Sequence, residues 1–452
     1  MTGVGAAPTL LWFRQDLRLS DNPALAAALD RRGPVIPVFI WAPEEEGDWP
    51  PGAASRWWLH HSLASLTAEL EKRGSRLIIR RGPTAAALSG LVADSGACAV
   101  MWNRRYEPAA VARDREVKSK LRESGVTAES FNGSLLFEPW TIRNSSEQPF
   151  RVFTPFWRSC LSKPLTPVCE DAPQRLPSPD LWPHSLALSE LSLEPAVDWA
   201  GGFRETWQPG ESGARSQLQR FLREALAEYS VNRDRPGLVG TSRLSPHLHF
   251  GEISPGEVRR AILGVTDDNH GDCEAYLRQL GWREFAYHLL HHHPQSPHQA
   301  LRPEFAAFPW RMHPEHFQAW KRGKTGYPLV DAGLRELWHT GWMHNRVRMV
   351  VASFLVKHLL IDWQAGAAWF WDTLVDADLA NNTLGWQWVA GCGADAAPYF
   401  RIFNPAIQEA KFDPDGGYVR RWVPESKHPF PIVDHGEARE RALAALESIR
   451  KR

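Results

Sequence analysis

The first third of the chain alternates short apolar runs with longer segments whose apolar residues recur at helical spacing. The apolar runs are Leu10–Phe13, Val35–Trp41, Arg76–Arg80 and Ala97–Trp102, with a weaker one near Phe131. The helical segments between them are Pro23–Arg32, Ser55–Arg73, Thr84–Ala93 and Glu107–Ser124. Such alternation indicates right-handed crossovers and a parallel sheet covered by helices on both faces. We therefore expect an α/β domain with a parallel five-stranded sheet, whose first helix is capped by Ser20 or Asp21.

The rest of the chain has a different pattern. From Glu138 to Trp207, proline-rich stretches interrupt every periodic element, which predicts a long connector. Beyond Trp207 the pattern is almost wholly helical. The helical segments are Ala214–Tyr229, Pro255–Leu263, Cys273–His291, Pro328–Thr340, Asn345–Leu360, Ala365–Thr373 and Glu437–Arg450. The predicted organisation is an α/β domain over residues 1–135, a connector over 136–206 and a large all-α domain over 207–452.

Composition excludes several classes of protein. No uncharged apolar run is long enough to span a membrane, and the first residues lack the pattern of a signal peptide, so a cytoplasmic protein with no membrane association is expected. The cysteines form no CxxC pair and are expected to be buried free thiols: Cys98, Cys160, Cys169, Cys273 and Cys392. The net charge is zero, so any contact with nucleic acid requires a local basic face.

The segment from Asp376 to Pro405 reads DADLANNTLGWQWVAGCGADAAPYFRIFNP. Its small residues, amides and tryptophans make a poor surface helix and suit a buried wall against a large polar-aromatic ligand. Its DxD and paired asparagines also leave open a divalent metal site, and with it a metal-dependent nuclease. No phosphate-binding GxxxxGK[ST] accompanies the segment.

Several long motifs, in the same order, resemble the DNA photolyase/cryptochrome family over nearly the whole chain. They are LLWFRQDLRLSDNPAL from Leu10, GTSRLSPHLHFGEISP from Gly240, WREF at Trp282, KTGYPLVDAGLREL from Lys324 and GWMHNRVRMVVASFLVKHLLIDW from Gly341. The resemblance is greatest to the bacterial class III, or class I, photolyases for cyclobutane pyrimidine dimers. It implies an α/β antenna domain, an all-α FAD-binding domain, UV-damaged DNA as partner and a monomer.

By this resemblance, a set of mostly polar residues would hold FAD. They are Tyr229, Thr241, Ser242, Arg243, Leu244, Ser245, Tyr276, Arg283, His344, Arg348, Asp376, Asp378 and Asn382. Hydroxyls and backbone N–H groups at a helix start bind phosphate well, which fits the Thr241–Ser245 stretch. For Asp376 and Asp378, a helix N-terminal cap is the alternative role.

The resemblance also implies a redox state and an electron chain. Asn382 would lie beside flavin N5, where a neutral amide, unlike a carboxylate, tolerates the fully reduced anion FADH⁻. Trp386, Trp363 and Trp310 would carry an electron from the surface to the flavin. Core packing is the alternative role for each of these tryptophans.

The DNA lesion would enter a pocket whose residues also follow from the resemblance: Arg233, Gln279, Trp282, Asn345, Arg346, Met349 and Trp388. Aromatic faces and a thioether suit a flat apolar dimer lifted out of the duplex. Photolyases for the (6-4) product have histidines where this chain has Asn345 and Met349, so the cyclobutane dimer is the expected substrate. Gln279 departs from well-known relatives, which have Glu there, and an amide offers fewer acceptors to the dimer.

Two further features concern the antenna pigment and a histidine run. Ala109 and Ala110 replace the Asn-Glu of some folate-binding relatives, so that folate site is not supported. A methenyltetrahydrofolate seated differently is the first expectation, and an 8-hydroxy-deazaflavin is the second. His288, His291, His292 and His293 suggest a solvated helix end rather than a metal site, and no metal is predicted.

The sequence therefore predicts light-driven repair of cyclobutane pyrimidine dimers, by electron transfer from photoexcited FADH⁻ to a lesion flipped into a pocket above the flavin. The alternative is a blue-light-sensing cryptochrome with little or no repair. Asn382 and the lack of a long tail after Arg452 favour repair, whereas Gln279 favours the alternative.

Overall fold

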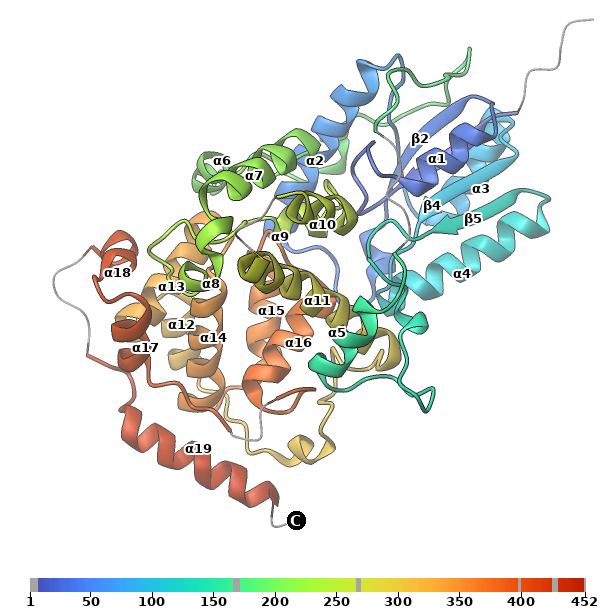
Figure 1. Ribbon diagram of the computed structural model, residues 1–452. Helices are drawn as coiled ribbons and strands as arrows, with labels where there is room; N and C mark the ends of the chain where they lie inside the picture. The colour runs from blue at the N-terminus through green and yellow to red at the C-terminus, as the bar shows by residue number, and fades with distance from the viewer. Residues whose placement is uncertain (1–6, 166–170, 266–269, 397–399, 425–429, 451–452) are drawn as a thin grey trace, which may run out of the picture.

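The N-terminal domain contains a parallel sheet of five strands in the order β3-β2-β1-β4-β5 (Figure 1). The computed structural model describes residues 7–165, 171–265, 270–396, 400–424 and 430–450. The strands are β1 (Thr9–Phe13), β2 (Val35–Trp41), β3 (Ile78–Arg81), β4 (Ala99–Asn103) and β5 (Thr127–Phe131). The helices between them are α1 (Pro23–Asp30), α2 (Ala53–Glu71), α3 (Thr84–Ser95) and α4 (Pro108–Glu123), with a 3-10 turn η1 (Pro43–Glu46). The predicted fold class and each predicted strand are confirmed.

The three central strands, β2, β1 and β4, are buried along their whole length, as expected for a sheet covered on both faces. The predicted cap of α1 was wrong. The side chain of Asn22 accepts a hydrogen bond from the Leu25 N–H at 3.1 Å. Asp21 instead accepts a hydrogen bond from the Ser254 hydroxyl, so its carboxylate joins two distant parts of the chain.

The C-terminal part is helical, as predicted. Its helices, with α5 and α6 of the preceding segment, are α5 (Phe153–Leu161), α6 (Gly201–Thr206), α7 (Glu211–Glu224), α8 (Tyr229–Asn232), α9 (Ser245–His249), α10 (Pro255–Leu263), α11 (His270–His292), α12 (Pro314–Lys321), α13 (Pro328–Thr340), α14 (Asn345–Ser353), α15 (Trp363–Thr373), α16 (Leu379–Ala390), α17 (Pro405–Phe412), α18 (Gly417–Trp422) and α19 (His435–Arg450). Shorter turns are η2 (Pro139–Thr141), η3 (Leu188–Leu191), η4 (Leu226–Glu228), η5 (Pro303–Ala307) and the π-helical η6 (Phe354–His358). The helix expected to run to Leu360 therefore ends at Ser353 and continues as a π-helix.

A buried carboxylate joins the sheet domain to the helical domain. Glu252 has no exposed surface and accepts hydrogen bonds from the Trp58 indole N–H at 2.9 Å and the Gly210 N–H at 2.7 Å. It also bonds to His247. Trp58 belongs to α2, whereas the other partners belong to the helical part, so the same carboxylate ties both domains. An apolar core that includes Trp57 of α2 and Phe203 surrounds this joint.

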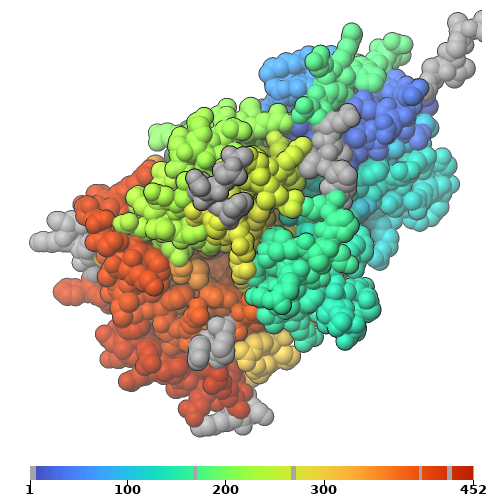
Figure 2. Space-filling model, in the orientation of Figure 1, coloured from blue at the N-terminus to red at the C-terminus, as the bar shows by residue number. Residues whose placement is uncertain are grey.

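The segment between the domains packs against α11. Figure 2 shows its teal-green atoms covering the junction between the sheet domain and the helices on this face. Glu284 of α11 accepts hydrogen bonds from the backbone N–H groups of Leu136 and Phe137, each at 3.0 Å. Burial raises the pKa of Glu284 to about 7. The start of the connector is thus held by a side chain in the WREF motif.

The described cysteines carry free thiols. Cys160, Cys273 and Cys392 are buried and Cys98 is half-buried, whereas Cys169 lies outside the described residues. Burial raises the pKa of Cys160 and Cys392, so these thiols stay protonated at neutral pH.

Gly281 allows α5 to lie close to α11, and replacing it should destabilise the protein. A Cβ at this position would lie 2.6 Å from the Trp157 ring. Gly281→Ala should cost about 1–3 kcal/mol by overpacking, although a Gly→Ala change in an open helix gains up to about 1 kcal/mol. Gly90→Ala in α3 is the matched control, because nothing lies within 4 Å of its Cβ. Thermal unfolding should show a lower midpoint for the first variant and a raised one for the second.

Candidate functional site

A cavity of about 490 Å³ lies among helices α8, α11, α14, α15 and α16. Predicted residues that line it are Arg233, Gln279, Trp282, Arg283, Asn345, Arg346, Arg348, Met349, Asp376, Asp378, Asn382, Trp386 and Trp388. The structure therefore brings all the predicted lesion residues and five of the thirteen predicted flavin residues into one space. A volume of this size is typical of cofactor and ligand sites.

Asp376 is buried and forms a two-point ion pair with Arg348. The Arg348 Nη2 donates to Oδ1 at 3.0 Å and to Oδ2 at 2.8 Å. The Nε of the same guanidinium donates to the Met343 carbonyl at 2.7 Å, which fixes its orientation. This ion pair offsets the cost of burying the carboxylate at the cavity wall.

Asp378 caps a helix, which was the alternative role given to it, and it also lines the cavity, so its flavin role stays a prediction. Its carboxylate accepts hydrogen bonds from the Asn381 N–H at 2.8 Å, at the start of α16, and from the Tyr287 hydroxyl. Burial alone would raise the pKa of Asp378, but His249, Arg283 and Tyr287 together hold it below its ordinary value. The carboxylate is therefore ionised at neutral pH.

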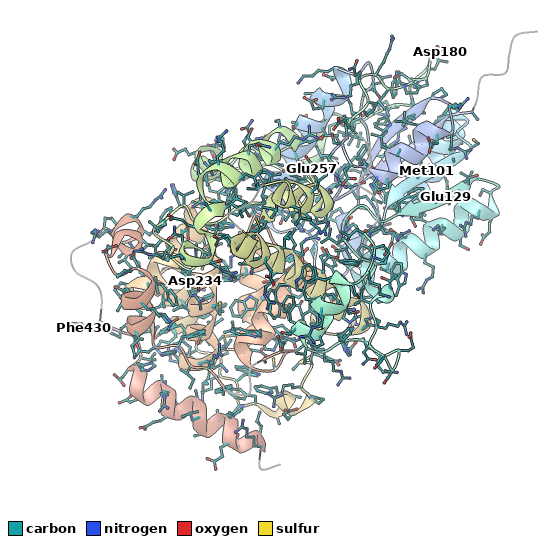
Figure 3. The ribbon with its side chains drawn as sticks, viewed as in Figure 1. Met101, Glu129, Asp180, Asp234, Glu257 and Phe430 are labelled. Carbon is teal, nitrogen blue, oxygen red and sulfur yellow. The ribbon has the colours of Figure 1, made fainter. Side chains whose placement is uncertain are left out.

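The lesion side of the cavity, the side that contains the predicted lesion residues, is aromatic with a basic rim. Trp282 and Trp388 are half-buried, and Arg346 pairs with Asp234 at 2.8 Å. Asp234, labelled in Figure 3, was missed by the sequence analysis although it follows Arg233 directly. The Gln279 amide nitrogen donates to the Ala275 carbonyl at 3.2 Å, which turns the amide oxygen away from the helix backbone.

The remaining predicted flavin residues lie outside the lining of this cavity. The Tyr276 hydroxyl donates a hydrogen bond to the Ser242 hydroxyl at 3.0 Å, and the Trp342 indole N–H donates to the Ser245 hydroxyl at 3.2 Å. Tyr229 packs edge-on against Tyr276. The rest of this set is Thr241, Arg243, Leu244 and His344. Among the described residues, the buried Nε2 of His344 has no partner, and burial lowers the His344 pKa to about 4.

The three tryptophans predicted as an electron chain belong to one apolar core. Trp386 and Trp363 are buried there, and the half-buried Trp310 packs against it. The indole N–H of Trp386 is buried with no acceptor in the described structure. The nearest rings to Trp386 are Phe370 at 5.0 Å and Trp320 at 6.4 Å between centroids.

Comparisons with known proteins decide the family. The family model for DNA photolyase matches residues 9–178, and the model for the FAD binding domain of DNA photolyase matches residues 276–429. A deoxyribodipyrimidine photo-lyase of Agrobacterium fabrum is 49% identical over 98% of both chains. This chain belongs to the photolyase/cryptochrome family.

Both photolyases and cryptochromes are among the relatives of this chain. Cryptochrome-2 of Arabidopsis thaliana is 42% identical, over 94% of this chain and 72% of that protein. The crystal structure of a bacterial class III photolyase from Agrobacterium tumefaciens has a TM-score of 0.96 at 48% identity, covering 100% of this chain and 99% of the other. An archaeal photolyase from Sulfolobus tokodaii, described with two FAD molecules, has a TM-score of 0.84 at 30% identity, covering 98% of this chain and 100% of the other.

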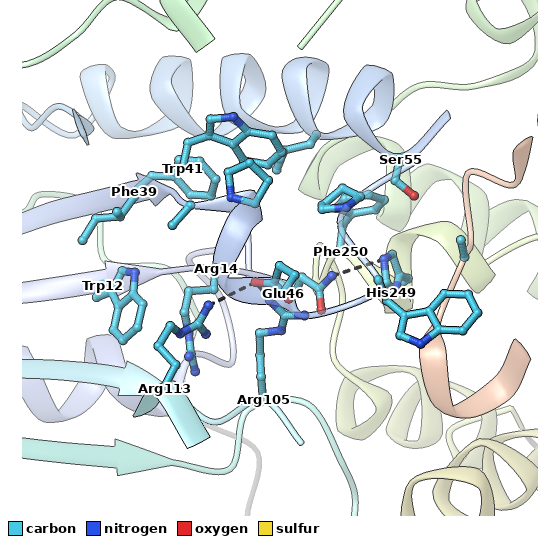
Figure 4. A pocket seen from close by; sticks show the side chains of 18 of the residues that line it. Trp12, Arg14, Phe39, Trp41, Glu46, Ser55, Arg105, Arg113, His249 and Phe250 are labelled. Carbon is cyan, nitrogen blue, oxygen red and sulfur yellow. Dashed lines mark hydrogen bonds and ion pairs between the residues drawn. The ribbon is translucent and has the colours of Figure 1, made fainter. Parts of the chain in front are cut away.

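A second, smaller cavity of about 70 Å³ lies between the sheet edge and the helical domain (Figure 4). Glu46 lies in it and accepts hydrogen bonds on Oε1 from Arg105 at 2.8 Å and Arg113 at 3.0 Å. Burial opposes ionisation of Glu46, but the two arginines lower its pKa below the ordinary value. Within the described structure, the Trp12 indole N–H and the Ser55 hydroxyl line this cavity without a partner. An adjoining cavity of about 170 Å³ shares part of this wall.

The prediction of a solvated helix end is wrong for His288 of the histidine run, whereas His291, His292 and His293 are half-buried at the end of α11. His288 is 1% exposed, and its Nε2 accepts a hydrogen bond from the Phe150 N–H at 3.0 Å. Its Nδ1 lies 3.1 Å from the Pro139 carbonyl. The prediction failed because the connector covers this end of α11. Within the described ranges, no group of three or more possible ligands could hold a metal ion, and no helix is long and apolar enough to cross a membrane.

The contacts of His288 with the Phe150 N–H and the Pro139 carbonyl should stabilise the protein less in acid. Burial lowers the His288 pKa to about 4, whereas an unfolded histidine titrates near 6.5. Between these values the unfolded chain binds more protons, so stability falls as the pH falls, by up to about 3 kcal/mol for this group.

His288→Gln should retain an acceptor for Phe150 without titrating. Thermal midpoints from pH 6.5 to 4 should therefore fall less steeply for this variant than for the unaltered protein. His339→Gln, at an exposed histidine of α13, serves as the control. Equal slopes for all three proteins would contradict a neutral buried His288.

Proposed function

We propose that this protein repairs cyclobutane pyrimidine dimers in DNA under light, with FAD as its cofactor. The observation that carries the proposal is the 490 Å³ cavity, in which Asp376, Arg348 and Asn382 share walls with Trp282 and Trp388. Cofactor-binding polar groups and a flat aromatic platform are both needed for chemistry on a base taken out of the stack. The 49% sequence identity with a deoxyribodipyrimidine photo-lyase of Agrobacterium fabrum supports the same assignment.

The described residues fit a flavin dinucleotide. The Arg348–Asp376 pair would fix the ring system. The Thr241–Ser245 stretch, which includes the cationic Arg243, would hold the phosphates. His344 supports this fit, because its buried Nε2 lacks a partner among the described residues and a polar ligand atom would supply one. When bound, FAD absorbs light and supplies one electron, which cleavage of the dimer needs and afterwards returns.

Asn382 would keep the ring environment neutral. Its amide nitrogen donates to the Ala367 carbonyl at 3.0 Å, so the orientation of the amide is fixed by the backbone of α15. An ionised side chain at this position would repel an anionic, fully reduced ring. The amide therefore favours FADH⁻ as the working state, which is the state that repair requires.

The lesion would stack against Trp282 and Trp388, with Met349 filling the space between them and Asn345 bonding a base edge. Neither Asn345 nor Met349 can exchange a proton, which favours the cyclobutane dimer over the (6-4) product. Gln279 supports repair more than its sequence position suggested. Because its amide nitrogen is held by Ala275, the amide oxygen can still accept one hydrogen bond from the dimer. Arg233 and Arg346 would contact phosphates at the rim.

Blue light should drive repair by the reduced holoprotein. We would mix it with a dimer-containing oligonucleotide and follow the recovery of base absorbance at 260 nm. Light-dependent recovery, absent in the dark and with undamaged oligonucleotide, is expected. The second candidate function is a light sensor, which the 42% identity with Cryptochrome-2 of Arabidopsis thaliana favours. Failure to restore absorbance under light, with the flavin reduced, would contradict repair and support the sensor.

Trp386, Trp363 and Trp310 would relay electrons from the protein surface. In the described part of the chain the buried Trp386 indole N–H has no acceptor, so an oxidised Trp386 would keep its proton and recover an electron from a neighbouring ring. Trp363→Phe should therefore slow photoreduction of the oxidised flavin while leaving repair by the pre-reduced protein nearly intact. Parallel loss of both activities would show that Trp363 acts on the lesion side or only in packing.

The smaller cavities around Glu46 would seat an antenna pigment. An ionised carboxylate with a second oxygen available suits the paired N–H donors of a pterin, so methenyltetrahydrofolate is proposed ahead of a deazaflavin. The cavities are too small for a whole folate, and its glutamyl tail would extend outside them. The archaeal photolyase with two FAD molecules keeps a flavin-type pigment as the alternative. Glu46→Gln should lower the folate content, measured as released chromophore, at unchanged FAD content. A released deazaflavin, or FAD at two molecules per chain, would contradict this assignment.

A further inference from the structure

The two tryptophans of the lesion side are tied to each other behind the cavity by a connector helix. Phe153 of α5 is 1% exposed and stacks on Trp282, with ring centroids 3.8 Å apart and planes within 9°. Phe153 is not part of the cavity lining, whereas Trp282 is. One face of the Trp282 ring is thus covered by Phe153, and the opposite face is left to the cavity.

Asp395 completes the link to Trp388. The Trp388 indole N–H donates to the Asp395 backbone carbonyl at 3.1 Å. Burial raises the pKa of the Asp395 carboxyl group, and the nearby backbone N–H of Phe153 opposes that rise. Asp395 adopts a left-handed backbone conformation with φ of 51°, which aspartate tolerates better than most residues. Asp395, which follows α16, therefore contacts Trp388 directly and lies next to Phe153, the ring that stacks on Trp282.

The position of Phe153 is set independently of any ligand. Trp157, one turn further along α5, stacks in line with Phe153 at 6.5 Å and 11° and packs where Gly281 lacks a side chain. His288 binds the Phe150 N–H just before α5. The connector helix is thus held against α11 by contacts on both sides of Phe153.

We propose that Phe153 and Asp395 are positioning residues for lesion recognition, which set the orientation of Trp282 and Trp388 before DNA binds. The proposal rests on the lesion role given to these tryptophans above. A large ring that is already fixed loses little conformational freedom when a ligand stacks on it, so the fixed arrangement favours binding. A flat, rigid lesion gains binding affinity from two aromatic walls at a fixed separation. Undamaged bases stay in the duplex and therefore gain no affinity from those walls.

The test uses the holoprotein with reduced flavin in the dark, and measures Kd for a dimer-containing and an undamaged oligonucleotide. Phe153→Leu removes the stacked ring, and Asp395→Gly removes the carboxylate while keeping the left-handed conformation accessible. Each should raise Kd for the lesion about threefold to tenfold and leave Kd for undamaged DNA unchanged. Asp395→Asn keeps an acceptor and should bind like the unaltered protein.

Phe156→Leu is the matched control, because Phe156 is buried on the same helix and packs on Phe285 and His288, whereas Phe153 stacks on Trp282. It should lower the thermal midpoint as much as Phe153→Leu without weakening lesion binding. A lesion Kd that rises equally in both variants would overturn the proposal, since it would show a general packing effect. So would an Asp395→Gly variant that binds the lesion normally.

A double-mutant cycle separates this proposal from the assignment on which it rests. Trp282→Leu should weaken lesion binding, and adding Phe153→Leu should then cause no further loss, because the ring it supports is gone. Additive losses would overturn the positioning role alone. Unchanged lesion affinity in Trp282→Leu itself would overturn the lesion role of Trp282 and the positioning role with it.

Discussion

The carboxylates at the start of α16 have to be buried and charged at the same time. Asp376 reaches this state through the two-point contact with Arg348 of α14, and Asp378 reaches it through the N-terminal N–H groups of α16 and the Tyr287 hydroxyl of α11. Each partner comes from a different helix, and an uncompensated buried carboxylate would cost several kcal/mol. The positions of α11, α14 and α16 around the cavity are therefore linked to the charge of two side chains.

The sequence predicted the parts of the fold that follow from periodicity. Alternating apolar runs predicted all five strands, and helical spacing predicted α10 and α13 with correct bounds. It failed where tertiary contacts decide. α16 has almost no amphipathic pattern because nearly every face is in use: one faces the cavity and others pack on α11 and α15. Asn22, rather than Ser20 or Asp21, caps α1 because Asp21 is engaged by Ser254 from the other domain.

The site shows the same division. Motif resemblance indicated residues of α11, α14 and α16, together with Arg233 at the end of α8, that the structure brings around one cavity. No spacing rule could have found that arrangement. Asp234 and Asn381 line the same cavity and were missed, although both lie next to residues that were named. Phe153 and Glu284 were missed for another reason. They act on neighbours that are remote in sequence, and nothing in the local pattern of the connector or of α11 reveals those partners.

The connector explains why the histidines of α11 and the aromatic cavity wall have to be considered together. A neutral His288 accepts the Phe150 N–H, and an ionised one has no lone pair for it. Loss of that bond would free the residues that lead into α5, and α5 carries the ring that stacks on Trp282. Acid would thus loosen the aromatic wall from behind while Asp376, whose partner Arg348 is on α14, still held its own wall of the cavity. Flavin retention and lesion affinity should therefore respond to acid at different pH values.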